Sequence, residues 1–320
     1  MCLYPNYGIR VLDYDTGAIT LKFIGHHNFL PKDVTNGSSL GDLVQIPCGQ
    51  CSECRVQKAR EWSVRLIHEK QLHNKSCFLT LTYNDFYLPA DGSLHKDAVQ
   101  IFIKNLRRRL DYHHDNKIRY YACGEYGSKS GRPHYHMILF GEDFAFDRKE
   151  FGVKHGFSYF TSDTVSSVWP YGFHIIGETT YDSIFYVSKY VTKKITGKLA
   201  EFHYDGLEPE FALMSRRPGI GHDWLLKYSN DVYNFDEVVL RDLKLRPPAY
   251  YDRLFECLHP FDFSVIKTMR QERFADANNK LTEKCSDQYG FNLELYKNYF
   301  DSKEAKVKRF LSIKKGNESL

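Results

Sequence analysis

Long apolar runs are missing from this chain, and so are two other sequence signals. No apolar run approaches the roughly 20 residues that a helix needs to cross a bilayer, so we expect a soluble protein without a membrane partner. The first residues lack the basic and then apolar pattern of a secretory signal, which predicts an intracellular protein. No Gly-x-x-x-x-Gly-Lys-Ser/Thr loop is present, and this excludes an NTPase motor of that kind.

Positive charge is modest in total but uneven in its distribution. The 320 residues carry a net charge of only +4, yet lysines and arginines gather at 55–70, 104–109, 189–198 and 303–315. Such clusters suit a phosphate backbone, although any one of them alone is more often a solvated helix face. Aromatic residues make up 15% of the chain, and they supply either stacking surfaces for unpaired bases or an aromatic-rich core.

Strand and helix signals both occur along the chain. Residues 55–72 place apolar side chains at helical intervals, which predicts a basic amphipathic helix. Residues 77–83 predict a central strand, and residues 118–126 and 134–140 predict two antiparallel strands joined by a hairpin turn. The other predictions are short strands before residue 47, helices over 96–112 and 181–196, a strand ending at Ile176, a basic loop at 214–221, and a tail from Lys303 that is either a short basic helix or a disordered end.

Two histidines alternate with a tyrosine in the segment Arg132-Pro-His134-Tyr-His136. Side chains two positions apart on a strand share a face, so the rings of His134 and His136 could reach one ion, and Glu125 on the preceding strand could complete the site. Two imidazoles and one carboxylate suit Mg²⁺ or Mn²⁺, which would polarise a scissile phosphate. The alternative is a pair of surface histidines on an edge strand.

A pair of tyrosines follows in the segment Tyr186-Val-Ser-Lys-Tyr190-Val-Thr-Lys-Lys194. On a helix Tyr186 and Tyr190 lie within about 40° of each other, with Lys189, Lys193 and Lys194 around the same side. An apolar stripe that includes Ile184 and Val187 lies opposite, so we expect this stripe to pack on the sheet and the tyrosines to be free for chemistry. Nearby ammonium groups and a metal-bound phosphate would help a phenol to attack phosphorus. The alternative is that the tyrosines are ordinary packing residues.

Three cysteines, Cys48, Cys51 and Cys54, stand at two-residue gaps directly before the first predicted helix, as metal ligands do. A closed structural Zn²⁺ site needs a fourth ligand, and Cys2, Cys77 or a distant histidine could provide it. Reduced, locally packed thiols are the alternative.

Weaker signals for a DNA surface come from other side chains. Thr80 and Thr82 alternate on the predicted central strand and could line the DNA-facing side of the sheet, although a buried strand that tolerates two threonines is the default interpretation. The arginines that we expect to contact DNA are Arg55, Arg60, Arg65, Arg132, Arg216 and Arg217.

The order of these motifs resembles one known family. The segments that carry the resemblance are PCGQCSECRVQKAREWSVRLIHE, FLTLTYNDFYLP, CGEYGSKSGRPHYHMILFG, WPYGFHIIGETTYDSIFYVSKYVTKKITG and MSRRPGIG, which cover most of residues 48–252. They are similar to the replication initiator proteins of small single-stranded DNA phages, the gokushovirus-like branch of the microviruses.

This resemblance implies an HUH endonuclease, in which two histidines around one bulky residue hold a catalytic metal. His134 and His136 match the metal ligands, Tyr135 the bulky residue, and Tyr186 and Tyr190 the paired nucleophiles. The implied fold is α+β, with a ferredoxin-like central antiparallel sheet, helices on one side, the histidine strand in its middle and the tyrosine helix beside it.

The implied activity is rolling-circle initiation through a 5′-phosphotyrosine. The implied partners are single-stranded or supercoiled origin DNA and the helicase, polymerase and single-strand binding protein of the host, in the cytoplasm of a bacterium. Two alternatives stay open: a two-tyrosine HUH transposase or plasmid initiator, and a DNA-binding protein without catalysis. We expect an N-terminal segment over 1–74, the endonuclease core over 75–200, and an extension over 201–320 for DNA binding or packing.

Overall fold

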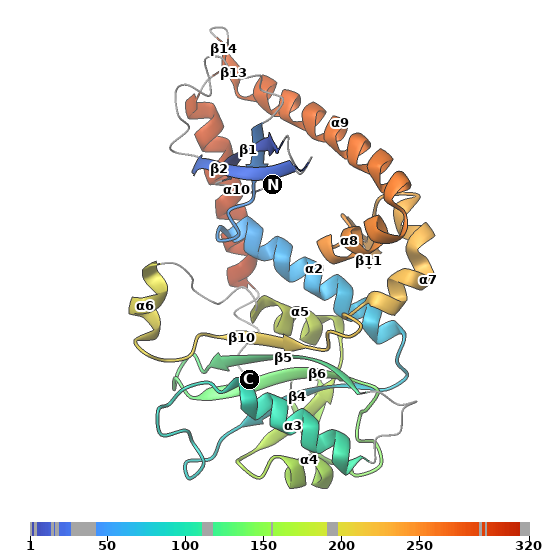
Figure 1. The fold of residues 1–320 in the computed structure, drawn as a ribbon. Helices are drawn as coiled ribbons and strands as arrows, with labels where there is room; N and C mark the ends of the chain where they lie inside the picture. The colour runs from blue at the N-terminus through green and yellow to red at the C-terminus, as the bar shows by residue number, and fades with distance from the viewer. Residues whose placement is uncertain are drawn as a thin grey trace. The chain divides into compact units, whose positions relative to one another are not determined.

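The computed structural model describes residues 2, 5–13, 16, 19–26, 43–110, 118–154, 156–190, 198–287, 290–291 and 293–313. The chain divides into two compact units, which are drawn in Figure 1. One unit combines Met1–Gln57 with Lys267–Leu320, and the other is Lys58–Ile266. The division into 1–74, 75–200 and 201–320 concerns function and stays a prediction.

A seven-stranded antiparallel sheet forms the centre of the unit Lys58–Ile266. Its strand order is β10-β5-β6-β4-β9-β8-β7. The strands are β4 (Ser76–Thr82), β5 (Arg119–Tyr126), β6 (Pro133–Phe140), β7 (Arg148–Lys154), β8 (Phe157–Ser162), β9 (His174–Glu178) and β10 (Phe211–Met214). The predicted central strand is β4, and the predicted hairpin is β5 and β6, so both predictions are confirmed.

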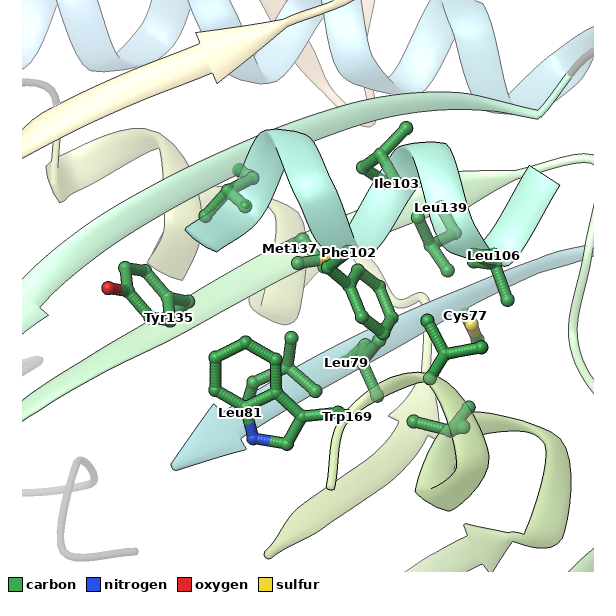
Figure 2. Close-up of a cluster of buried hydrophobic side chains, with 14 of the residues drawn as sticks. Cys77, Leu79, Leu81, Phe102, Ile103, Leu106, Tyr135, Met137, Leu139 and Trp169 are labelled. Atoms are coloured by element: carbon green, nitrogen blue, oxygen red, sulfur yellow. The ribbon is translucent and has the colours of Figure 1, made fainter. Parts of the chain in front are cut away.

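One face of this sheet is covered by α3 (Lys96–Arg109) and α4 (Asp163–Val168). Alternate residues of β4 and β6, among them Leu79 and Met137, point to this face because successive side chains of a strand alternate. Figure 2 shows these side chains against Phe102 and Leu106 of α3 and against Trp169. The apolar stripe predicted for the helix at 96–112 is therefore the buried face of α3.

The opposite face of the sheet packs against α2 (Ser52–Gln71) and α5 (Tyr181–Tyr190). Leu66 of α2 and Val187 of α5 share a buried cluster with Tyr121 and Ile138 of the sheet. The predicted α+β sheet flanked by helices is thus confirmed, but the prediction that its helices lie on one side is wrong. The inner strands are apolar in both directions, so both of their faces require a cover.

The rest of this unit has its own apolar cluster around Tyr251 and Phe255. It is built mainly from α7 (His222–Tyr233), β11 (Val238–Leu240), α8 (Ala249–Leu258) and the start of α9 (Pro260–Lys284). The short elements α6 (Lys198–Tyr204) and β12 (Leu243–Leu245) complete the order.

The unit that contains the start of the chain holds a small antiparallel sheet in the order β2-β1-β3. Its elements are β1 (Asn6–Leu12), β2 (Ile19–His26), β3 (Leu43–Ile46), the first turn of α2, β13 (Ser286–Asp287), β14 (Gly290–Phe291) and α10 (Leu293–Ile313). The predicted short strands are confirmed, and the tail from Lys303 to Ile313 is helical. Among the described helices, none combines the length and the apolar character that crossing a bilayer requires.

Candidate metal and nucleophile site

The pairing of β5 with β6 brings Glu125 to the two histidines. Glu125 lies directly opposite His134, and Cys123 lies opposite His136. Residues directly opposite each other on antiparallel strands share a face, so the carboxylate and both imidazoles point the same way. The hairpin turn supports this register, because Gly131 takes a backbone φ of +65° that favours glycine. The predicted position of Glu125 on the histidine face is confirmed.

The three side chains meet at short range. The Oε1 atom of Glu125 is 2.9 Å from Nε2 of His134 and 3.0 Å from Nε2 of His136. One ligand atom from each residue lies within 4.8 Å of the other two, and Glu125 and His136 are buried. The described residues therefore contain a possible Glu/His/His metal site at the place that the sequence predicts.

The hydrogen bonds behind the rings show that this site fits a cation. Nδ1 of His134 is 3.2 Å from the carbonyl oxygen of Arg132, which can only accept a hydrogen bond. In the neutral ring Nδ1 must carry the proton, and Nε2 presents a lone pair toward Glu125. Nδ1 of His136 is 2.9 Å from Oγ1 of Thr80, which can accept in the same way. Lone pairs that converge on one point are the donor set of a metal site.

Helix α5 begins with a reciprocal cap and carries the tyrosines to the histidine face. The backbone amide of Ser183 donates to Oγ1 of Thr180, at 3.1 Å, and the amide of Thr180 donates to Oγ of Ser183, at 2.8 Å. The ring of His136 is stacked with that of Tyr190, at a centroid distance of 5.7 Å, and meets Tyr186 edge-on at 5.4 Å. Both phenols therefore lie beside the metal ligands.

The prediction that the tyrosine side of α5 faces away from the packing surface is wrong. Tyr190 is only 4% exposed and belongs to the same buried cluster as Val187. The reason is that α5 has two partners: it packs on β5 and β6, and it also meets α2, where Ser188 and Ser63 hydroxyls are 2.7 Å apart. Burial, followed by the nearby carboxylate of Glu125, raises the pKa of Tyr190.

The predicted lysines and arginines are placed in different ways. Lys189 is half-buried, with its ammonium 5.4 Å from the ring centroid of Phe185, while Lys193 and Lys194 lie outside the described residues. Arg65 is enclosed, because its Nε donates to the carbonyl of Ile220 and its guanidinium lies over two aromatic rings. Among the other arginines, Arg55, Arg60 and Arg132 are half-buried, and Arg216 and Arg217 are exposed.

Arg132 also braces the turn before the histidine strand. Its guanidinium donates to Oδ1 of Asp85, at 2.6 Å, and to the carbonyl of Tyr83, at 3.0 Å. The contacts of all six arginines with DNA stay predictions.

The cysteines form a separate cluster in the unit that contains the start of the chain. Cys48, Cys51 and Cys54 are joined by Cys2, and their four sulfur atoms lie within 4.8 Å of one another. Cys2 was one of three candidates for the fourth ligand, whereas Cys77 is buried in the core of the seven-stranded sheet.

Comparison with known proteins places the chain in a family. Residues 76–195 match the family of the replication-associated protein ORF2. The Replication-associated protein ORF2 of Spiroplasma virus 4 is 34% identical over 220 residues, which are 66% of this chain and 68% of the relative. The chain belongs to the phage replication-associated proteins. The resemblance to microvirus replication proteins is thereby confirmed.

Two further relatives of this replication-associated protein come from other phages. The Replication-associated protein VP4 of Bdellovibrio phage phiMH2K is 32% identical over 221 residues, 67% of this chain and 69% of the relative. The Replication-associated protein ORF4 of Chlamydia phage 1 is 28% identical over 253 residues, 75% of this chain and 61% of the relative. No solved structure matches.

Sequence reasoning missed two contributors to the site of this replication-associated protein. One is the carbonyl of Arg132, which orients His134 and which no side-chain pattern reveals. The other is Phe173, which is exposed beside the site. Its carbonyl accepts a hydrogen bond from the amide of Thr82, the residue opposite His134, so the three residues form one row across the sheet. The signal that points to Phe173 is its place just before a strand that pairs with β4.

Proposed function

We propose that this protein initiates rolling-circle replication by cutting one DNA strand at an origin and rejoining it through Tyr186 and Tyr190. The observation that carries the proposal is the contact of both phenol rings with His136, one of two histidines that converge on Glu125. The names of the relatives, which all describe replication-associated proteins, support a role as a replication initiator.

Glu125, His134 and His136 would hold a divalent ion, Mg²⁺ or Mn²⁺. One carboxylate and two imidazoles leave positions open for phosphate oxygen and water. When bound, the ion supplies Lewis-acid polarisation of the scissile phosphate. Thr80 and the carbonyl of Arg132 orient the two imidazoles by holding the nitrogen of each ring that faces away from Glu125.

The tyrosines supply the nucleophiles. A phenol oxygen attacks the phosphorus, the bond from phosphorus to the 3′-oxygen breaks, and the DNA is left with a free 3′-hydroxyl and a 5′-phosphate esterified to tyrosine. The raised pKa of Tyr190 means that its phenol keeps its proton at neutral pH, so the proton must leave as the attack proceeds.

The second tyrosine permits rejoining without ATP. After synthesis it cuts the regenerated origin in the same way, and the new 3′-hydroxyl attacks the first phosphotyrosine to close a circle. One phosphodiester is exchanged for another, so the bond energy is conserved. The polymerase, helicase and single-strand binding protein of a bacterial host would extend, separate and cover the strands in its cytoplasm.

An exposed aromatic pair marks where unpaired bases would lie. Phe173 is 43% exposed in the same row as His134, and the ring of Phe151 contacts it at a centroid distance of 5.1 Å. Bases stack on such rings without sequence preference. The aromatic pair continues the histidine face toward β9, so a single strand that reaches the tyrosines would cross it.

A covalent adduct tests the proposal. The purified full chain is incubated with Mn²⁺ and single-stranded origin DNA, and protein that carries DNA is detected by its retarded migration under denaturing conditions. We expect an adduct with the unmodified chain and none with the Tyr186→Phe, Tyr190→Phe double variant. Tyr181→Phe is the matched control, because Tyr181 is on the same helix and packs against Phe185 instead of the histidines.

The outcomes separate the competing functions. An adduct that persists in the double variant would show that other residues are the nucleophiles. DNA binding without any adduct would favour a binding protein without catalysis. Cutting at transposon ends in preference to a replication origin would favour a two-tyrosine transposase.

A further inference from the structure

The four cysteines of the unit that contains the start of the chain form a cluster that cutting and joining do not use. Cys2 precedes β1, Cys48 follows β3, Cys51 directly precedes α2, and Cys54 lies in its first turn. All four are free thiols, so no disulfide explains why they converge.

The spacing of the sulfur atoms matches a single tetrahedral ion. Zinc binds thiolate sulfur at about 2.3 Å, and four ligands at that distance in a tetrahedron are about 3.8 Å from one another. Sγ of Cys2 is 3.8 Å from Sγ of Cys51, and no pair in the cluster is farther apart than 4.8 Å. A four-iron cluster would hold its cysteines farther apart, because its own iron and sulfide atoms lie between them.

Backbone amides around the cluster favour charged sulfur. The amide of Cys48 donates to Sγ of Cys2, at 3.2 Å, and the amide of Cys51 donates to Sγ of Cys48, at 3.3 Å. The N-terminus of α2, with its positive end of the helix dipole, is beside Cys51 and Cys54. The turn between Cys48 and Cys51 requires Gly49, whose backbone φ is +73°.

We propose that Cys2, Cys48, Cys51 and Cys54 bind one structural Zn²⁺. Four thiolates are soft ligands that close the tetrahedral shell of zinc and leave no position for substrate. The ion ties the beginning of the chain and the end of β3 to the first turn of α2. It is chemically distinct from the Glu125, His134 and His136 site, whose carboxylate and open positions suit a harder ion.

Metal content tests the proposal in the full chain. A His134→Ala, His136→Ala variant removes the other site, so any zinc that remains must be held elsewhere. We expect this variant, purified from a zinc-containing medium, to keep about one zinc per chain by elemental analysis. Adding Cys48→Ser should abolish the zinc, whereas adding Cys257→Ser should not, because Cys257 is exposed and outside the cluster.

Thiol labelling tests the same site without a substitution that could prevent folding. Cys2, Cys48 and Cys54 are only partly buried, so without a metal they should react with a maleimide in the native chain. With zinc bound we expect labelling of Cys257 before these three, and labelling of all three after a zinc chelator is added, as located by peptide mass spectrometry. Native labelling that is independent of the chelator, zinc that survives Cys48→Ser, or bound iron with sulfide would overturn the proposal.

Discussion

The two tyrosines of α5 differ in their access to solvent. Tyr190 is almost fully buried, while Tyr186 is half-buried and meets both Tyr190 and the edge of His136. A DNA phosphate can reach the more exposed phenol with less rearrangement of the helix. Tyr186 is therefore the better candidate for the first cut, and Tyr190 for the second.

Single variants separate these roles. We expect Tyr186→Phe to abolish the covalent adduct with single-stranded origin DNA, and Tyr190→Phe to form the adduct but to lose joining. The measurement follows adduct and circular product over time with an end-labelled strand. The reverse pattern would assign the first cut to Tyr190, and an adduct in both variants would mean that either tyrosine can start the reaction.

Thr80 orients His136 through the contact with Nδ1. Loss of such a partner typically weakens metal binding by about 10- to 100-fold. We expect this loss for Mn²⁺ in Thr80→Val, measured by titration, with recovery of adduct formation when Mn²⁺ is raised. The control is Thr82→Val on the same strand, because the hydroxyl of Thr82 donates to the carbonyl of Phe173. Equal affinities in the two variants would count against the role of Thr80.

At the scale of elements, α2 contributes an unusual buried histidine. The ring of His68 stacks on Trp224 at a centroid distance of 3.4 Å, and its Nδ1 is 3.0 Å from the hydroxyl of Tyr251. Burial lowers the pKa of His68 to about 3. Folding therefore keeps this ring neutral, whereas the unfolded chain protonates it near its ordinary pKa of about 6.5.

The packing of α2 should consequently weaken in acid. Between pH values of about 6.5 and about 3 the unfolded chain binds a proton that the folded chain does not, so the free energy of unfolding falls as the pH falls, by up to about 1.4 kcal/mol per pH unit from this group. We expect His68→Phe to show a smaller fall than the unmodified chain in denaturant unfolding at pH 7 and 5. His222→Phe, at a more exposed position, is the control. Identical pH dependence in all three would exclude His68 as the cause.

The aromatic pair on the histidine face makes a second prediction at this scale. Stacking on an aromatic ring contributes about 1–3 kcal/mol per base. We expect Phe173→Ala to weaken single-stranded DNA binding by that amount, measured by fluorescence anisotropy in the Tyr186→Phe, Tyr190→Phe background. Phe146→Ala removes a ring that is also exposed, and it should leave the affinity unchanged. Equal losses in both variants would mean that DNA does not use this face.

The elements that the sequence predicts well are those whose pattern is local. The alternation in β4 and β6 and the stripe of α3 follow from the residues themselves, and the hairpin turn fixes Glu125 opposite His134. The burial of Tyr190 could not be predicted in this way, because it depends on the packing of α5 against both the sheet and α2. The meeting of Cys2 with Cys48 depends likewise on the pairing of β1 with β3, which brings distant parts of the chain together.

For the molecule as a whole, each compact unit contains its own group of candidate metal ligands. The two groups should respond differently to the same chelator, because a carboxylate and two imidazoles hold Mg²⁺ or Mn²⁺ far less tightly than four thiolates hold Zn²⁺. We expect dialysis against dilute EDTA to abolish adduct formation while the zinc content stays constant, and added Mn²⁺ to restore the adduct. Loss of both together, or an adduct that forms without added metal, would contradict this independence.

The direct pairing of Glu125 with His134 also has a consequence for folding. A slip of the β5–β6 register by one residue would turn Glu125 to the opposite face of the sheet, where it could no longer share an ion with the histidines. A divalent ion that binds all three residues therefore favours the correctly paired hairpin over the slipped ones by mass action. Besides its chemical role, the metal would act as a proofreader of strand alignment.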